Sequence, residues 1–238
     1  MLLTPLEICD YTRPMPGREI VLANNEIYHV FNRGVASLPT FTNKKSYQRA
    51  VDTLFYYQNT KTPLKYAKFL NLSVRDRAQV LESLKEQKRR WVEILCFCFM
   101  SNHFHLLLKQ LEDGGISKFM SNFTNSYTRY FNTRQERVGP LFQGKFKGVR
   151  IETQEQLIHV SRYIHLKPYT GYVVKTITGL ESYPYSSFPE YISLSQSNYC
   201  SKEPVLSYFE NSDSYRKFVF DNADYQRELD KIRHLTLE

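Results

Sequence analysis

The sequence predicts an α+β protein with a ferredoxin-like antiparallel four-stranded sheet and helices, plus a basic helical insertion and a C-terminal extension. Segments with strand and helix patterns follow one another in the order strand, helix, strand, strand, helix, strand, helix. The first six form the split βαβ arrangement of such a sheet, in which the first and third strands are central. The 238 residues are 42% hydrophobic, which is sufficient to fill a core.

The first strand and helix are predicted near the start of this series. Residues 27–32 (IYHVFN) are rich in aromatic and β-branched residues and end at Arg33-Gly34, which is typical of a strand. Asn43 can cap a helix. The helix is indicated by apolar residues at helical spacing, namely Tyr47, Val51, Leu54 and Phe55.

Residues 61–90 differ in character from their surroundings. They contain nine Lys or Arg against three acidic residues, with a helical pattern at Val80, Leu81 and Leu84. We interpret them as a basic helical insertion. A solvated surface helix explains this charge more readily than a dedicated binding element does.

A hairpin is predicted in the middle of the chain. Residues 91–99 (WVEILCFCF) form a continuous apolar run typical of a buried strand, residues 100–102 can turn, and residues 103–111 (HFHLLLKQL) form the next strand. In the sheet topology above, this third strand is central. The sequence therefore places His103 and His105 in the middle of the sheet.

The last elements of the predicted core are two helices and one strand. Aromatic residues at helical spacing predict a helix over residues 116–133, and residues 146–151 alternate as a strand. Thr153 can cap a final helix that runs to about Leu166 and stops at Pro168.

The tail after Tyr172 is rich in Tyr and Ser. Its pattern allows short helices, for example over residues 215–233.

The charge favours a polyanionic partner. The net charge is +8 and the pI near 9.2, which suits nucleic acid or an anionic membrane surface. Aromatic residues make up 15% of the chain, and some could stack on unpaired bases.

No segment has the pattern of a signal peptide or the length of a membrane span. The four cysteines do not form a disulfide framework, so we expect a cytoplasmic protein without a membrane partner.

His103 and His105 are the first candidate functional pair. Side chains two apart on a strand point to the same face, about 6.6 Å apart along it, so two imidazoles can converge on one metal ion. Phe104, Leu106 and Leu108 point to the opposite, core face. A His-x-His pair alone is also compatible with two structural histidines.

The hairpin suggests a competing site. If Met100 and Ser101 are the turn residues, Cys98 faces His103 and Cys96 faces His105, which would gather a Cys₂His₂ zinc set. Against this, structural zinc sites draw their cysteines from turns, and both cysteines also suit a core.

Three segments together resemble the single-tyrosine HUH transposase family, which includes the insertion-sequence transposases and the REP-associated tyrosine transposases. They are FMSNHFHLLL, GPLFQGKFKGVRIET and RYIHLKP, supported by YHVFNRG and YPYSS. These motifs extend from about residue 27 to 188 in the order of the family. The resemblance implies a catalytic domain over residues 1–188, with the insertion at about 60–90, and a C-terminal extension over residues 189–238.

The resemblance implies that His103 and His105 bind a divalent metal, Mg²⁺ or Mn²⁺, and that Tyr163 is the nucleophile. The helix pattern agrees, because Leu157, Val160 and Ile164 form a packing stripe while Tyr163 lies on a polar face. The other members of that polar face are Gln156, His159 and Lys167.

Lys167 departs from the family pattern, in which many members have Asn. A protonated lysine has no lone pair for a metal. Three readings stay open: Lys167 is a catalytic residue that contacts the scissile phosphate, His159 or Gln156 supplies the third ligand, or metal affinity and activity are lost.

The implied function is a single-stranded DNA endonuclease and strand transferase that acts through a 5′-phosphotyrosine intermediate, at sites flanked by a DNA hairpin. A cluster of basic residues before the tyrosine helix is the candidate DNA track: Arg129, Arg134, Arg137, Lys145, Lys147 and Arg150. Dispersed surface charge explains about half of them equally well. The resemblance leaves a monomer and a homodimer open.

Three other functions remain to be separated from this one. Lys167 keeps open the alternative of a protein that has kept the fold but only binds DNA or RNA. A ferredoxin-like RNA-binding module would stack bases on exposed sheet aromatics. A structural zinc protein would use Cys96 and Cys98.

Overall fold

The computed structural model describes residues 21–195 and 199–228. Four strands form one antiparallel sheet in the order β2-β3-β1-β4. Their bounds are β1 Ile27–Arg33, β2 Val92–Phe99, β3 His103–Gln110 and β4 Lys147–Ile151. The predicted fold class and the central position of the first and third strands are confirmed.

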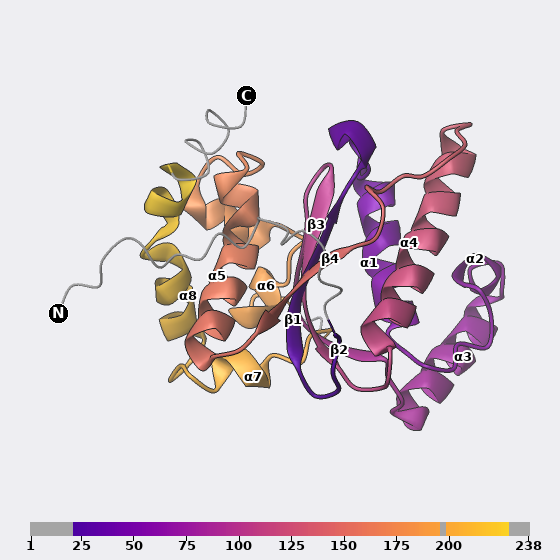
Figure 1. The fold of residues 1–238 in the computed structure, drawn as a ribbon, viewed down its shortest axis with the longest axis horizontal. Helices are drawn as coiled ribbons and strands as arrows, with labels where there is room; N and C mark the ends of the chain where they lie inside the picture. Colours follow the sequence, from indigo (N-terminus) through magenta and orange to yellow (C-terminus); the bar gives the residue numbers. More distant parts are fainter. Residues whose placement is uncertain (1–20, 196–198, 229–238) are drawn as a thin grey trace.

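Helices cover both faces of the sheet (Figure 1). On one face lie α1 (Lys44–Tyr57) and α4 (Gly115–Arg134), which contact each other. On the other face lies α5 (Gln154–Thr170), which contacts β2, β3 and β4. On the same face lie the short helices α6 (Phe188–Tyr191) and α7 (Glu203–Leu206), and α8 (Ser212–Phe220) lies on the outer side of α5. The sheet is therefore the middle layer of three.

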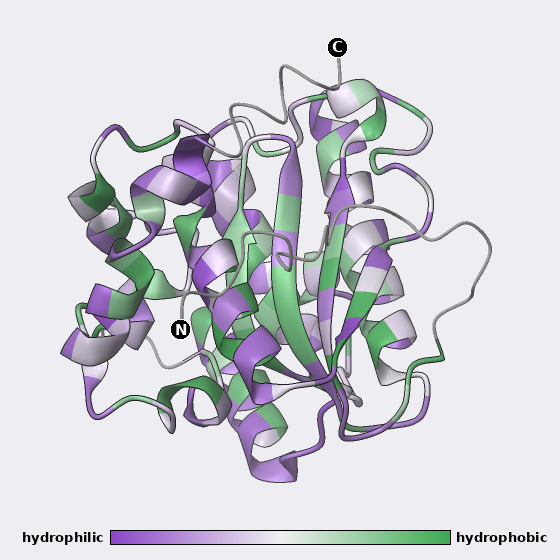
Figure 2. Ribbon diagram, turned by 60° about the vertical axis from the view of Figure 1, so that its left-hand side comes forward, coloured by the Kyte–Doolittle hydropathy of each residue, from purple (hydrophilic) through white to green (hydrophobic). Residues whose placement is uncertain are grey.

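Strand alternation divides the side chains of β3 between these two layers. Phe104, Leu106 and Leu108 are fully buried, and the ring of Phe104 packs edge-on against Phe123 of α4. His103, His105 and Leu107 point the other way, toward α5. The hydrophobic colour of the central strands in Figure 2 reflects this burial on both faces.

The predicted helix starts are confirmed. The side chain of Asn43 accepts from the backbone N–H of Ser46 and begins α1, and Thr153 accepts from Gln156 N–H and begins α5. Both starts are capping boxes, in which the third helical side chain bonds back to the cap.

The predicted end of α5 at about Leu166 is wrong. The helix continues through Pro168 to Thr170 and ends at Gly171. A proline removes one backbone N–H and disfavours a continuing helix. Here it stands in the last turn, so only one hydrogen bond is lost. Pro168 O also accepts from the N–H groups of Val173 and Val174, which closes the helix end.

The insertion is helical, as predicted, and consists of α2 (Tyr66–Phe69) and α3 (Val74–Gln87). Asn59 and Arg90 form a bridge where the chain leaves and rejoins the core. Tyr66 and Phe69 pack against Tyr56 of α1. Most of α3 is exposed, and only its Leu84 is buried.

The C-terminal segment is packed into the core, whereas the boundary at residue 188 stays a prediction. The helix predicted over residues 215–233 begins earlier, because Asn211 caps α8 at Ser212, and a turn interrupts it at 221–222. Residues 229–233 lie outside the described part. Tyr215 and Val219 of α8 are fully buried.

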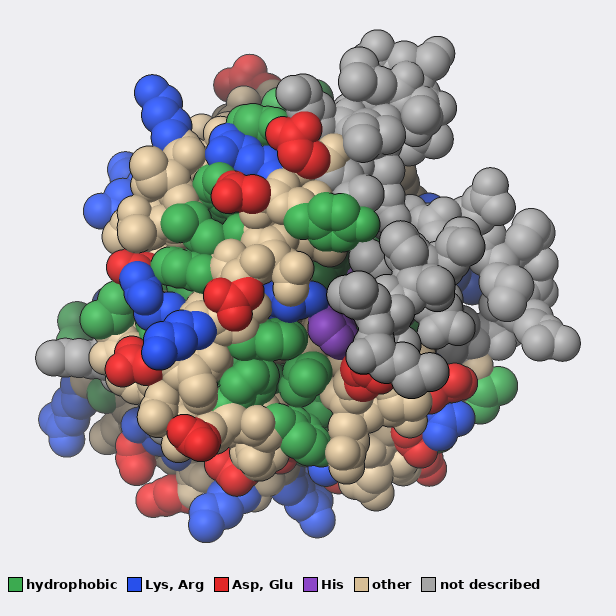
Figure 3. All heavy atoms as spheres, turned by 90° about the vertical axis from the view of Figure 1, so that its left-hand side faces the viewer, with side chains coloured by type: hydrophobic (Ala, Val, Ile, Leu, Met, Phe, Trp, Pro, Cys, Tyr) green, Lys and Arg blue, Asp and Glu red, His purple; other side chains and the backbone are tan. Residues whose placement is uncertain are grey.

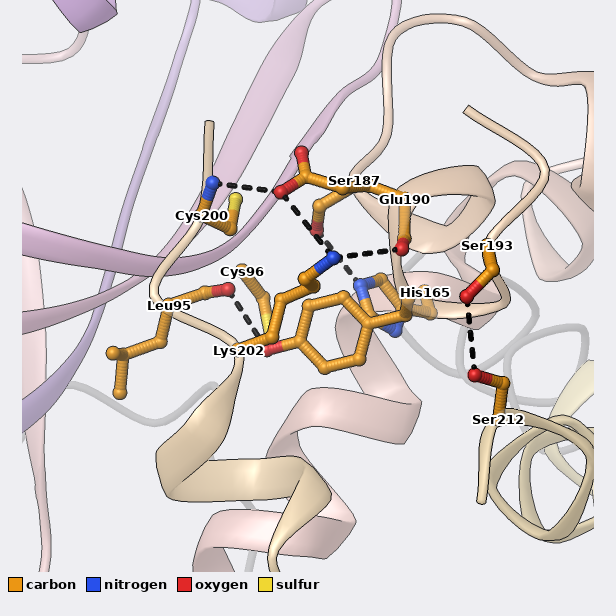
Figure 4. Close-up of polar contacts among 10 residues, drawn as sticks. Leu95, Cys96, His165, Ser187, Glu190, Ser193, Cys200, Lys202 and Ser212 are labelled. Carbon is orange, nitrogen blue, oxygen red and sulfur yellow. Dashed lines mark hydrogen bonds and ion pairs between the residues drawn. The ribbon is translucent and has the colours of Figure 1, made fainter. Parts of the chain in front are cut away.

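Buried polar groups join this segment to α5 and β2 (Figure 4). The carboxylate of Glu190 accepts from the N–H of Cys200 at 2.9 Å and lies 4.0 Å from the ammonium of Lys202. On α5, His165 Nδ1 lies 2.7 Å from the Tyr215 hydroxyl and His165 Nε2 lies 2.8 Å from Ser187 Oγ. Burial lowers the pKa of His165 to about 3.

We expect the free energy of unfolding to fall as the pH is lowered from about 6.5 toward 3. The unfolded histidine binds a proton below about pH 6.5, but folded His165 does so only near pH 3. The stability is therefore complete above the unfolded pKa and is lost toward acid, by about 1.4 kcal/mol per pH unit per histidine. Urea unfolding at pH 7, 6, 5 and 4.5 measures it. His165→Gln should reduce the slope, and an unchanged slope would contradict the assignment. His159→Gln, at a half-exposed histidine, is the control.

Among the described residues, no helix combines the length and apolar character needed to cross a membrane.

Candidate active site

Three histidines share the face of the sheet that α5 covers. His103 and His105 come from β3, and His29 comes from the neighbouring strand β1. The rings of His103 and His105 are 5.2 Å apart and nearly perpendicular, and those of His29 and His105 are 5.2 Å apart and stacked. The predicted pairing of the two β3 histidines on one face is confirmed, with a third imidazole beside them.

Tyr163 lies against this histidine cluster. Helix α5 places its ring 5.5 Å from the ring of His105 and 5.9 Å from that of His29, edge-on to both. One turn further along α5, the ammonium of Lys167 lies 4.2 Å from the centre of the Tyr163 ring. The structure therefore brings together His103, His105, Tyr163 and Lys167, as the sequence predicted.

The buried imidazoles are neutral at ordinary pH. Burial, and then the positive charge of Lys167, lowers the pKa of His29 to about 3. Burial also lowers the pKa of His105 well below its usual value, and His103, His29, Lys167 and Arg33 add to the effect. A neutral imidazole keeps a lone pair on one nitrogen, which is the form that binds a metal.

The ring of His103 is oriented by its neighbour. Its Nδ1 lies 2.7 Å from the side-chain oxygen of Asn102, which can only accept. Nδ1 therefore carries the proton and Nε2 carries the lone pair. Asn102 sits in the turn before β3, and its own amide nitrogen donates to the backbone oxygen of Ser37.

The donor set fits a divalent cation held by two protein ligands. Two neutral imidazoles can bind a divalent cation, and the remaining positions, which would belong to oxygen atoms of phosphate and water, suit Mg²⁺ or Mn²⁺. In the described part of the chain, no three His, Cys, Asp or Glu side chains are grouped so that they could hold a metal.

The proposed third ligands on α5 have other contacts. Gln156 Oε1 accepts from the N–H groups of Glu152 and Thr153 at the helix start. His159 bonds to Arg162 at 2.8 Å and packs against Phe218 of α8.

The zinc arrangement is wrong. Phe99 pairs with Phe104, so in the same register Cys98 is opposite His105 and Cys96 is opposite Leu107. The turn is longer than the two residues assumed, and each cysteine is displaced by two positions. Burial raises the pKa of Cys96 to about 12 and that of Cys98 further, so both thiols stay protonated.

The sheet does not offer the open aromatic platform of an RNA-binding module. The five residues 104–108 of β3 are all buried, under helices on both sides.

The predicted basic track is divided between the two faces of the sheet. Lys147 of β4 pairs with Phe31 and so lies on the histidine face. Arg150 pairs with Tyr28, lies on the opposite face and forms a 2.8 Å salt bridge with Glu26.

The rest of the track lies outside this strand. Arg129 and Arg134 are exposed on α4, and Lys145 is exposed just before β4. Arg137 donates to Asn132 and to the backbone of Pro140. On the face formed by α5 to α8, outside the grey atoms, acidic and basic side chains are interspersed (Figure 3).

Sequence reasoning missed His29 and Phe31. The ring of Phe31 lies 5.1 Å from His29 and 5.7 Å from His105. The signal was present, because His29 and Phe31 alternate with the apolar Tyr28 and Val30 in the first strand. It becomes informative only once the register between β1 and β3 is known.

The sequence and the fold of the chain are similar to those of transposases. A model of the family "Transposase IS200 like" matches residues 55–167. The structure of a REP-associated tyrosine transposase bound to a REP hairpin is similar at a TM-score of 0.51 and 14% identity, over 75% of this chain and 86% of that chain. The tRNA(His) guanylyltransferase of Saccharomyces cerevisiae gives a TM-score of 0.30 at 15% identity, over 80% of each chain. No curated protein matches the sequence significantly.

Proposed function

Residues 55–167 place the chain in the family of IS200-like transposases, and from this premise we propose that it cleaves and rejoins single-stranded DNA through a covalent bond to Tyr163. The observation that carries the proposal is the position of Tyr163. Its ring lies against His105 on one side and under the ammonium of Lys167. Of the 18 tyrosines in the chain, this one is both part of the RYIHLKP motif and adjacent to the candidate metal ligand His105.

The cleavage step can be written with these residues. The phenolic oxygen of Tyr163 attacks the phosphorus of a phosphodiester while its proton leaves to water. The new O–P bond joins Tyr163 to the 5′ phosphate of the downstream DNA fragment, which is a 5′-phosphotyrosine. The bond from phosphorus to the 3′ oxygen breaks, and that oxygen takes up a proton as a 3′-hydroxyl. A second 3′-hydroxyl can reverse the step on another strand, because the bond energy is conserved in the phosphotyrosine.

The surrounding groups assist a weak nucleophile. A phenol titrates near pH 10, so it needs stabilisation of the charge that develops at the phosphate. A divalent cation, Mg²⁺ or Mn²⁺, held by His103 and His105 would supply that stabilisation as a Lewis acid. We assign Lys167 to a non-bridging oxygen of the same phosphate. Its ammonium is already within 4.2 Å of the Tyr163 ring centre, and a lysine donates to phosphate as a point charge.

The substrate we propose is single-stranded DNA next to a hairpin. The similar structure is that of a REP-associated tyrosine transposase bound to a REP hairpin, and the net charge of +8 favours a polyanion. Lys147 of the proposed track lies on the histidine face, and Lys145 precedes it in the chain by two residues. Binding through such contacts should weaken as salt is raised.

A covalent adduct tests the proposal. The purified protein is incubated with a hairpin oligonucleotide carrying a labelled single-stranded flank and Mn²⁺, and is then denatured. A labelled band at the mass of protein plus DNA, mapped by mass spectrometry to a phosphotyrosine at position 163, is the expected result. DNA binding without any such band would instead favour a protein that only binds nucleic acid.

A further inference from the structure

His29 is a buried histidine that the cleavage step does not use. Only 2% of its surface is exposed, in the middle of β1. Its Nε2 lies 3.0 Å from Nδ1 of His105, which is hydrogen-bonding distance. Its own Nδ1 is buried without a hydrogen-bond partner in the described part of the chain. A buried polar atom without a partner destabilises a fold and is found where a site has a functional demand.

His29 and His105 share one proton in the hydrogen bond between them. Which of the two nitrogen atoms carries this proton decides whether His105 can bind a cation. If His29 Nε2 donates, neutral His105 carries its remaining proton on Nε2 and has no lone pair toward the site. If His105 Nδ1 donates, its Nε2 keeps the lone pair, and His29 acts as the acceptor with its own proton on Nδ1.

Metal-bound histidines usually donate their second ring N–H to an acceptor, which fixes the tautomer and the ring orientation. For His103, that acceptor is the Asn102 side chain. For His105, the candidate acceptor is Nε2 of His29, which lies 3.0 Å from His105 Nδ1.

We propose that His29 is a positioning residue that accepts the Nδ1 proton of His105 and thereby holds His105 as a cation ligand. This inference rests on the proposed function for the identity of the ligands, and it adds His29 to the site. His29 would act through His105, without contact to the cation or the DNA. The stacked arrangement of the two rings, with Phe31 packed beside both, keeps their nitrogen atoms aligned.

The test measures Mn²⁺ binding to the full chain without DNA, by electron paramagnetic resonance titration. His29→Phe keeps an aromatic ring and removes the acceptor, and we expect Mn²⁺ to bind about 10- to 100-fold more weakly. His29→Gln can accept through its side-chain oxygen and should restore much of the affinity. The control is His165→Gln, which alters a buried histidine on the far side of α5 and should leave Mn²⁺ binding unchanged. Equal affinity of His29→Phe and the wild type would overturn the proposal.

A second measurement needs no variant and so does not depend on folding. Long-range ¹H–¹⁵N correlation spectra of the wild type, with Zn²⁺ as a diamagnetic probe, report which nitrogen of each histidine carries a proton. We expect the proton of His105 on Nδ1. A proton on Nε2 of His105 would overturn the proposal even if DNA cleavage is observed. Conversely, absence of the Tyr163 adduct would remove the proposed cleavage and leave the tautomer result standing.

Discussion

Tyr163→Phe is expected to abolish the covalent protein–DNA adduct while leaving DNA binding nearly intact. The substitution removes one oxygen atom, the proposed nucleophile, and keeps the ring that packs against His29 and His105. In the proposed mechanism Tyr163 forms the phosphotyrosine bond, so cleavage should fall by about three orders of magnitude or more. Denaturing gels of labelled single-stranded oligonucleotides measure the adduct, and a filter-binding titration measures affinity.

The matched control for this variant is Tyr172→Phe. Tyr172 follows the end of α5 and is 55% exposed, so its hydroxyl can be removed without disturbing the core. It should form the adduct as the wild type does. If Tyr163→Phe still gives a labelled band, another residue is the nucleophile, and peptide mapping of that band will identify it.

His103→Ala is expected to remove the metal dependence of cleavage. His103 is the more accessible of the two candidate ligands, because it begins β3 and is only half-buried, whereas His105 is 7% exposed. Truncation at His103 therefore affects the site with less risk to the fold. A bound cation contributes several kcal/mol to such a transition state, so cleavage at saturating Mn²⁺ should fall by about 100-fold or more.

The measurement is the cleavage rate as a function of Mn²⁺ concentration at fixed DNA concentration. His159→Ala is the control, because this half-exposed histidine on α5 packs against Phe218 of α8 and not against the histidine cluster. It should show the wild-type dependence on Mn²⁺. A wild-type response in His103→Ala would show that the two β3 histidines do not hold the cation.

The error in the predicted hairpin turn changed the strand partners of the histidines and not the face on which they lie. The hairpin turn was predicted two residues too short, which placed Cys98 opposite His103 in place of His105. Because side chains alternate with a period of two, an error of two residues changes the partner and keeps the face. The histidines were therefore assigned to the correct face even though their neighbours were not.

The sequence by itself determined the features that depend on neighbouring residues along the chain. The caps at Asn43 and Thr153 fixed where α1 and α5 begin. The alternation in HFHLLL fixed that His103 and His105 share a face. Capping and pleating act over two to four residues, so a local pattern is enough to predict them.

Only the tertiary structure decided which distant residues complete the site. His29 meets His105 because β1 pairs with β3 in one register, and Tyr163 meets both because α5 packs on that face of the sheet. The pairing of β4 with β1 decided that Lys147, and not Arg150, lies on the histidine face. These contacts join residues up to 134 positions apart in the chain. They depend on the register of paired strands and on helix packing, which no local spacing specifies.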